Sequence, residues 1–280
     1  SLGELTFRSN VEVYRYNEKY IIVYDDHRYV LNILFEAFKL GIFTSCPNII
    51  YFDRHDDACN PNIVKSELFK RWGAAELKDV SSPNFWSFVE FDLGYLDDDW
   101  LLAGMELGLI NNSVVIGQQD NSNIRALNNC FVSTDGKVHE LYSINHLNTS
   151  LGCRGCLGDN VIKEPYYTAV RNIFEYNQPP YGRYNKFSKE ATTPFILDFD
   201  LDCFTTECEE KIYVWPETIF RRMYYEHDEV RFFMREIISR CQFITICREP
   251  GCCGGIGESN KILEYLDQYL FEGNLGTMSI

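Results

Sequence analysis

The stretch Pro194-Phe195-Ile196-Leu197-Asp198-Phe199-Asp200-Leu201-Asp202-Cys203-Phe204 joins an apolar run to three carboxylates at alternate positions. A short apolar run that follows a proline is typical of a buried strand in a parallel sheet. Alternate residues of a strand point to one face, so Asp198, Asp200 and Asp202 are expected to lie together. Such like charges repel one another unless something neutralises them. The pattern therefore indicates a divalent metal site, or else acids that cap a helix or face water beyond the strand.

A second run of alternating potential ligands follows another apolar segment. The apolar residues at 48–52 predict a strand that leads directly into Asp53-Arg54-His55-Asp56-Asp57. In an extended chain, Asp53, His55 and Asp57 share one side. One imidazole with two carboxylates suits Mn, Fe or Zn better than Ca or Mg alone. The alternative is a loop in which these acids form salt bridges with the arginine.

Composition excludes several classes of protein. The 280 residues include 45% hydrophobic residues, which is ample for a core, and carry a net charge of -15. This charge disfavours a nucleic-acid partner and favours metal ions or a cationic substrate. The sequence has no apolar run long enough for a membrane span, and its start does not resemble a secretory signal. Its eleven scattered cysteines are interpreted as reduced thiols of a cytoplasmic protein.

Strands and helices are expected to alternate along the chain. Strands are predicted at 11–16, 20–24, 48–52, 114–117, 131–134, 137–142 and 243–247, besides the strand that begins at Pro194 and carries the three acids. Helices are predicted from 30 to 40, from 100, at 166–176, at 217–240, and after an N-cap at Ser259. This order favours a single domain, residues 1–280, with a three-layer α/β/α fold and a mainly parallel central sheet.

Four separate segments place polar residues just after predicted strands. They are His27, the group from Asp53 to Asp57, the group from Asp198, and Glu249. In parallel sheets the functional crevice lies beyond the carboxyl ends of the strands. The histidines and aspartates are more numerous than one ion requires, so two ions bridged by carboxylates are expected. Such a pair activates a water molecule for hydrolysis.

In order and spacing, Asp53-Arg54-His55-Asp56-Asp57 and Asp198-Phe199-Asp200 resemble the signature segments of the arginase and ureohydrolase superfamily. The addition of Asp26-His27, the run that continues to Phe204, and Arg248-Glu249-Pro250 makes the chain most similar to the peptide arginases. Enzymes of that branch convert arginine residues to ornithine in ribosomally made natural-product precursors. The resemblance also implies an arginase/deacetylase-like fold.

The resemblance implies a centre of two Mn²⁺ ions and a role for each residue. Asp53 and Asp198 would bridge the ions; His27 and Asp57 would complete one shell, and His55 and Asp200 the other. Glu249 would bind the substrate guanidinium, because a planar bidentate pair suits that role. Asp57 would also orient the attacking hydroxide and pass on its proton, which yields ornithine and urea.

The chain departs from ordinary arginases at several points. Tyr24-Asp25-Asp26-His27 replaces a Gly-Gly-Asp-His-Ser form, and Asp202 stands where enzymes of free arginine have no ligand. Asp202 is therefore a candidate for supporting the ligands or contacting substrate. No segment that would recognise the α-amino and α-carboxylate groups of free arginine is evident, which favours a peptide substrate. His146 and His139 are candidates for a proton shuttle. Cys153-x-x-Cys156 lacks the second pair that a structural zinc site needs.

The sequence thus predicts a metal-dependent hydrolase that converts arginine to ornithine in a precursor peptide with a leader and a core. Neither nucleic acid nor membrane is expected as a partner. Two alternatives remain open. One is a ureohydrolase or amidohydrolase of small molecules such as free arginine, agmatine or an acetylated amine. The other is a metal-binding protein without catalytic activity on the same fold.

Overall fold

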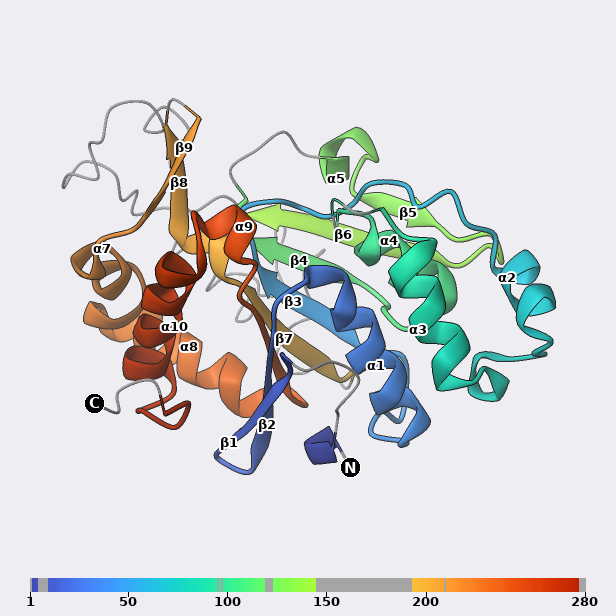
Figure 1. The fold of residues 1–280 in the computed structure, drawn as a ribbon, viewed down its shortest axis with the longest axis horizontal. Coiled ribbons are helices and arrows are strands. Elements are labelled where there is room, and N and C mark those ends of the chain that lie inside the picture. The colour runs from blue at the N-terminus through green and yellow to red at the C-terminus, as the bar shows by residue number, and fades with distance from the viewer. Residues whose placement is uncertain are drawn as a thin grey trace.

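The central feature of the protein, in a computed structural model, is an eight-stranded sheet (Figure 1). The structure describes residues 2–4, 10–94, 96, 98–118, 123–144, 193–208 and 210–276. The strands run in the order β1-β2-β10-β7-β3-β4-β6-β5. Their bounds are β1 Glu12–Tyr16, β2 Lys19–Tyr24, β3 Asn48–Phe52, β4 Ser113–Ile116, β5 Cys130–Val132, β6 Val138–Ile144, β7 Phe195–Asp200 and β10 Ile244–Cys247. His146, the Cys153/Cys156 pair and the helix expected at 166–176 lie outside the described residues.

The six inner strands are parallel, and the two edge strands are antiparallel to their neighbours. The antiparallel pairs β1–β2 and β5–β6 join strands that the sequence predicts at 11–16 with 20–24 and at 131–134 with 137–142. Inner strands such as β3 and β7 are buried along their whole length because helices cover both sides of the sheet.

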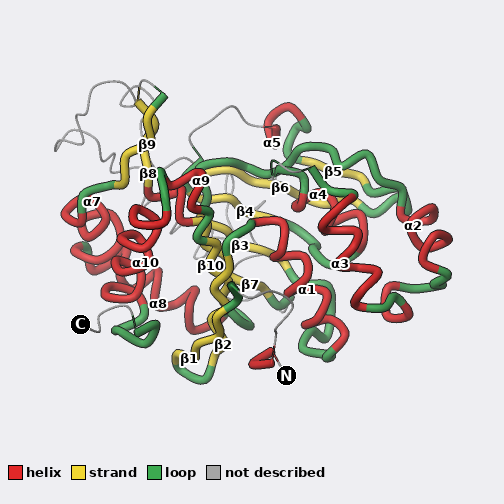
Figure 2. The backbone as a smooth tube through the Cα atoms, viewed as in Figure 1, coloured by secondary structure: helices red, strands yellow, loops and turns green. Residues whose placement is uncertain are grey.

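Helices form a layer on each face of the sheet, as Figure 2 shows. One layer contains α1 Val30–Lys39, α3 Ser82–Phe91 and α4 Trp100–Leu107, and the other contains α7 Glu217–Arg221, α8 Asp228–Arg240 and α10 Ile256–Leu270. Shorter elements are α2 Lys65–Trp72, α5 Asn123–Ala126, α9 Pro250–Cys253 and the hairpin of β8 Thr205–Cys208 with β9 Lys211–Val214. The structure confirms the expected three-layer α/β/α fold with a mainly parallel sheet.

β3 and β7 are neighbours in the sheet, and the chain adds later strands on opposite sides of this pair. After β3 the chain moves outward through β4 to β6, whereas after β7 it moves the other way to β10, which lies beside β2. Loops that leave the carboxyl ends of such neighbouring strands diverge and leave a crevice, where α/β proteins bind ligands. The two acidic segments of the sequence leave β3 and β7, on either side of this reversal.

Two predicted helix boundaries are wrong. The helix expected at 217–240 is interrupted: a π-helical turn at Arg222–Glu226 follows α7, and His227 is extended before α8 begins. Ser259 is not an N-cap, because α10 already begins at Ile256 after Gly255, and the Ser259 hydroxyl donates to the Ile256 carbonyl oxygen.

Two further observations concern membrane-spanning helices and disulfide bonds. Within the described ranges, no helix is long and apolar enough to cross a membrane. The eight cysteines whose side chains are described are all unpaired.

Candidate metal centre

His27 lies at the centre of the acidic site. It begins a 3₁₀ turn, His27–Tyr29, directly after β2, and only 1% of its surface is exposed. Its Nδ1 atom is 2.9 Å from Oδ2 of Asp57 and 3.0 Å from Oδ2 of Asp200, and its Nε2 atom is 2.8 Å from Oδ2 of Asp198. Nδ1 therefore meets one carboxylate from the loop after β3 and one from β7, and Nε2 meets a second carboxylate of β7.

The loop after β3 carries Asp53, His55 and Asp57, but β3 ends at Phe52 and the loop is bent rather than extended as the spacing predicts. Asp53 is fully buried and accepts a hydrogen bond from the backbone N–H of His55. Asp57 has a φ of 47°, in the left-handed region, which is uncommon for residues other than glycine but which aspartate adopts more readily than most. Asp56 turns away and anchors the loop, because its carboxylate accepts from the backbone N–H of Ile124 at 2.9 Å.

The three aspartates of the β7 segment separate into different environments. Asp198 and Asp200 lie within the strand, but Asp202 lies in the 3₁₀ turn Leu201–Phe204 that follows it. The carboxylate of Asp202 lies 2.9 Å from Nδ1 of His55 and accepts from the backbone N–H of Arg54. Asp202 therefore faces the loop after β3, whereas Asp198 faces His27.

Three overlapping groups of side chains place their donor atoms within 4.8 Å of one another. The groups are His27 with Asp53 and Asp57; Asp53 with His55 and Asp202; and Asp202 with Glu249 and Cys252. Asp53 is common to the first two groups, and Asp202 is common to the last two. A carboxylate shared between neighbouring donor groups is the arrangement that holds two divalent ions close together.

Several buried atoms of these groups are left without a hydrogen bond. They are Nδ1 of His27, Oδ2 of Asp53 and Oδ2 of Asp202. Buried polar atoms are normally hydrogen-bonded, so these atoms point to a missing cation. One imidazole and two carboxylates per group match a transition-metal ion such as Mn²⁺, Fe²⁺ or Zn²⁺. The residues present therefore fit a pair of divalent ions.

The protonation of the site reflects its excess of acids. Burial raises the pKa of Asp53, and the neighbouring Asp57 and Asp200 carboxylates raise it further. Burial alone would lower the pKa of His27, but the carboxylates of Asp198 and Asp200 hold it well above its usual value. Burial opposes the charge of Asp202 as well, but His55 outweighs it and lowers that pKa. Protons thus compensate for the missing positive charge in a metal-free protein.

Glu249 reaches the same site from the loop after β10. Its backbone is left-handed, with a φ of 35°, and burial together with Asp200 raises its pKa well above the ordinary value. Arg248 fixes this loop from behind, because its guanidinium donates to Asp25, to Glu12 and to the carbonyl oxygen of Asn10. The motif Arg248-Glu249 therefore combines an anchor with a side chain directed at the acidic cluster.

Three residues that the sequence does not single out support the centre. Tyr24 and Thr245 both donate hydrogen bonds to Oδ1 of Asp198, and Trp100 donates through its indole nitrogen to Oδ2 of Asp57. The Trp100 ring also lies 4.8 Å from the ring of His27, centroid to centroid. Only the position of Tyr24, two residues before Asp26-His27, hints at such a role in the sequence.

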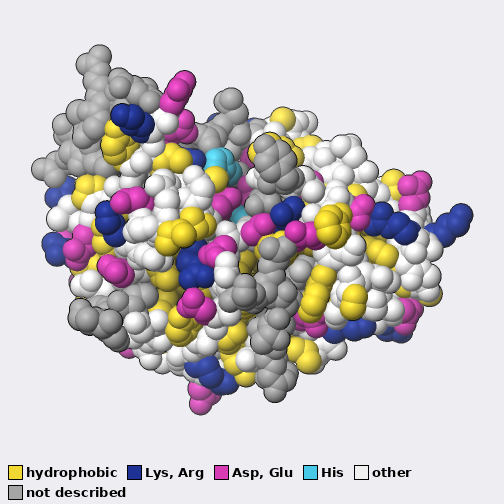
Figure 3. Space-filling model, in the orientation of Figure 1, with side chains coloured by type: hydrophobic (Ala, Val, Ile, Leu, Met, Phe, Trp, Pro, Cys, Tyr) yellow, Lys and Arg dark blue, Asp and Glu magenta, His cyan; other side chains and the backbone are white. Residues whose placement is uncertain are grey.

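His139 is not brought to this site. It lies in β6 and is buried, and its Nδ1 atom contacts the carbonyl oxygen of Asn111. The structure therefore makes His139 a packing residue, which excludes it as a proton shuttle at this centre. His55 is the more accessible histidine of the cluster, with 35% of its side chain exposed. On the face drawn in Figure 3, histidine side chains reach the surface beside acidic ones.

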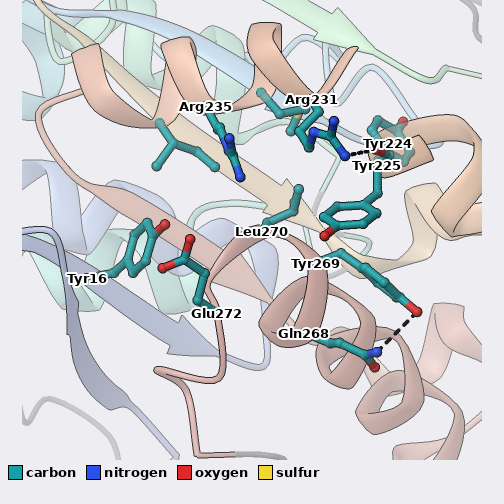
Figure 4. A pocket seen from close by; sticks show the side chains of 11 residues that line it. Tyr16, Tyr224, Tyr225, Arg231, Arg235, Gln268, Tyr269, Leu270 and Glu272 are labelled. Atoms are coloured by element: carbon teal, nitrogen blue, oxygen red, sulfur yellow. Dashed lines mark hydrogen bonds between the residues drawn. The ribbon is translucent and has the colours of Figure 1, made fainter. Parts of the chain in front are cut away.

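A separate cavity of about 70 Å³ lies between α8 and α10. It is lined mainly by tyrosines and two arginines, among them Tyr225, Tyr269 and Arg231 (Figure 4). Tyr16, which pairs with Lys19 at the start of β2, also lines it. This cavity therefore lies beside the amino end of β2 and shares no residue with the acidic cluster.

The chain matches no protein-family model and no curated protein. Among solved structures it is similar to the crystal structure of Helicobacter pylori arginase, with 15% sequence identity and a TM-score of 0.35 over 86% of this chain and 70% of that chain. A similarity of this size carries no argument about activity. The fold class follows from the sheet itself, and the chemistry of the site from its side chains.

Proposed function

We propose that the protein is a dinuclear metal-dependent hydrolase that converts arginine residues of a peptide to ornithine and releases urea. The observation that carries the proposal is the sharing of Asp53 between a group with His27 and Asp57 and a group with His55 and Asp202. Asp200, whose Oδ2 is 3.0 Å from Nδ1 of His27 and whose Oδ1 accepts from the backbone of Asp202, joins the same cluster.

In this proposal Asp53 would serve both ions, and Asp200, beside His27 and the backbone of Asp202, would be a further ligand. His27 and Asp57 would hold the first ion, and His55 and Asp202 would hold the second. Two divalent ions, Mn²⁺ in this proposal, supply Lewis-acid activation of a water molecule when they are bound. Asp57 is placed to orient that water and to accept its proton, while Trp100 fixes the Asp57 carboxylate.

The role of Asp198 changes in this proposal. The resemblance implies a bridging ligand, but Asp198 holds Nε2 of His27, whereas Asp53, Asp57 and Asp200 all lie at Nδ1. A carboxylate that accepts from one imidazole nitrogen leaves the other nitrogen as the metal ligand and raises its basicity. Asp198 is therefore proposed as a positioning residue, and Asp202 takes the ligand role.

The charge of the site favours a cationic substrate. Its carboxylates are those of Asp53, Asp57, Asp198, Asp200, Asp202 and Glu249. Two divalent ions and the nearby Arg54 do not fully neutralise these acids when all are ionised. Glu249 would then form a bidentate pair with a planar guanidinium group. The net charge of -15 also favours the approach of an arginine-containing peptide.

The test compares substrates at equal arginine concentration. Protein loaded with Mn²⁺ is incubated with an arginine-containing precursor peptide, with an N-acetylated arginine amide, and with free arginine and agmatine. We expect urea release from the first two and a mass loss of about 42 Da per converted arginine, the difference between arginine and ornithine by metal-assisted hydrolysis. Turnover of free arginine or agmatine alone would refute the peptide substrate, and no urea from any guanidine would refute the hydrolase.

A further inference from the structure

The third donor group contains a thiol that the proposed reaction does not use. Cys252, Asp202 and Glu249 place donor atoms within 4.8 Å of one another. The group is separate from the one that contains Asp53 and His55, although it shares Asp202 with it. Asp202 is fully buried, and its Oδ2 atom makes no hydrogen bond. A buried carboxylate oxygen without a hydrogen bond can accept a cation, and Asp202 faces both the second donor group and this third one.

The backbone explains why Cys252 alone of the vicinal pair faces this group. Glu249 adopts a left-handed conformation before α9, and the N–H of Cys252 donates to its carbonyl oxygen at 3.0 Å, so both side chains belong to one tight turn. The thiol of Cys253 is buried and points back to the carbonyl oxygen of Arg248, at 3.3 Å. The turn therefore presents one thiol and one carboxylate to Asp202.

We propose that Asp202, Glu249 and Cys252 form a third cation position, which prefers a soft divalent ion such as Zn²⁺ or Cd²⁺ and inhibits the enzyme when it is filled. A thiolate selects soft ions over Mn²⁺, which prefers oxygen and nitrogen ligands. The inhibitory part rests on the proposed function, because an ion bound by Glu249 occupies the carboxylate that would bind the guanidinium group. The binding part requires only the three side chains.

The third position is expected to fill after the first two. It shares Asp202 with the second position, so its ion is repelled by the ion already present there. Zn²⁺ added beyond two equivalents of Mn²⁺ should therefore inhibit competitively with the peptide, with a raised KM and little change in kcat.

Binding is tested by ultraviolet spectroscopy, which needs no turnover. Reduced protein loaded with two equivalents of Mn²⁺ is titrated with Cd²⁺, and thiolate-to-cadmium charge-transfer absorption is recorded. We expect the band of Cys252→Ser to be smaller than the wild-type band by the contribution of one thiolate. Cys59→Ser is the matched control, because its half-buried thiol also lies beside a carboxylate, Asp98, at 3.2 Å but outside the three groups.

The Cys153/Cys156 pair is present in all three proteins, so its contribution cancels in the comparison. Equal bands in wild type and Cys252→Ser would overturn the proposal. Release of Mn²⁺ in step with the Cys252-dependent band would also overturn it, because Cys252 would then be a ligand of the second ion.

Inhibition is tested separately with Zn²⁺ and the peptide substrate. Cys252→Ser should require about tenfold more Zn²⁺ for half inhibition, as expected for the loss of a metal-site donor. Equal sensitivity of the two proteins would refute the inhibitory role. A Cys252-dependent cadmium band in a protein that releases no urea would uphold the binding site and refute the hydrolase. Urea release from a protein without that band would uphold the hydrolase and refute the third cation position.

Discussion

The imidazole of His27 is held between two acids: Nε2 lies 2.8 Å from Oδ2 of Asp198, and Nδ1 lies 2.9 Å from Oδ2 of Asp57. Asp198 itself accepts hydrogen bonds from the hydroxyl groups of Tyr24 in β2 and Thr245 in β10. These are the strands that precede His27 and Glu249 in the chain. In the proposed centre, this relationship leaves Nδ1 as the nitrogen that would bind a metal ion and gives Asp198 a positioning role.

Replacement of Asp198 by asparagine should weaken the metal site without abolishing it. The amide preserves the shape but no longer accepts from Nε2 of His27 with a full charge, and such losses typically lower metal affinity about 10–100-fold. Calorimetric titration with Mn²⁺ should still show two equivalents. A complete loss of binding, equal to that of Asp53→Asn, would instead identify Asp198 as a ligand.

Replacement of Trp100 by phenylalanine tests the support of Asp57. The ring against His27 is largely retained, but the N–H that donates to Oδ2 of Asp57 is lost. We expect Mn²⁺ affinity to fall about tenfold and stability to fall by about 1–3 kcal/mol, the cost of an unsatisfied buried acceptor. Trp72→Phe, in the aromatic cluster with Phe85 and Phe88, is the control. If both variants bind Mn²⁺ equally well, Trp100 is a packing residue only.

The metal-free protein should lose stability as the pH rises from about 5 to about 8. The folded state raises the pKa of Asp53, Glu249 and His27, so it holds these protons more tightly than the unfolded chain. This stabilisation is complete below the ordinary pKa values and is lost as the pH rises through the raised ones. Asp202, whose pKa is lowered, stays ionised throughout this range and does not oppose the trend.

Thermal melting across this pH range, with and without Mn²⁺, checks the expectation. Bound Mn²⁺ should restore the melting temperature near pH 8 and have little effect near pH 5, where protons compete for the same ligands. A metal-free melting temperature that stays constant or increases with pH would contradict the expected protonation of the cluster.

Replacement of Glu249 by glutamine should separate substrate binding from metal binding. The variant keeps the side-chain shape but loses the charge that pairs with a guanidinium group, so kcat/KM should fall by a factor of about 100 or more. Two equivalents of Mn²⁺ should still bind, as elemental analysis would show. Loss of an ion from Glu249→Gln would identify Glu249 as a ligand rather than a substrate-binding residue.

Much of the fold could be predicted because its signals are local. The apolar segments at 48–52 and 243–247 become β3 and β10 with shifts of at most one residue at their ends. The interruption of the helix at His227 could not be predicted, because apolar residues continue at helical spacing on both sides of it. The start of α10 at Ile256 could not be predicted either, because Ile256, Gly257 and Glu258 show no amphipathic pattern.

In the candidate site, too, features set by local sequence could be predicted and features set by contacts between distant segments could not. Asp53 shares one donor group with Asp57 and another with His55, but in a bent loop rather than in the extended chain that the spacing predicts. The roles of Asp198 and Asp202 were less accessible, since strand alternation ends at Asp200 and the following 3₁₀ turn redirects Asp202 to His55. Tyr24, Thr245 and Trp100 act across the fold, so only the packing of distant segments reveals them.

The central claim is that two ions share Asp53, and metal stoichiometry tests it most directly. Wild-type protein and the Asp53→Asn variant are stripped, reconstituted with Mn²⁺, freed of excess metal and analysed for Mn per chain. A matched Asp92→Asn variant, at an exposed ion pair with Arg71, controls for a general change of charge. We predict two equivalents in the wild type and in Asp92→Asn, and the loss of both ions from Asp53→Asn. A single equivalent in the wild type, or two retained by Asp53→Asn, would contradict the shared centre.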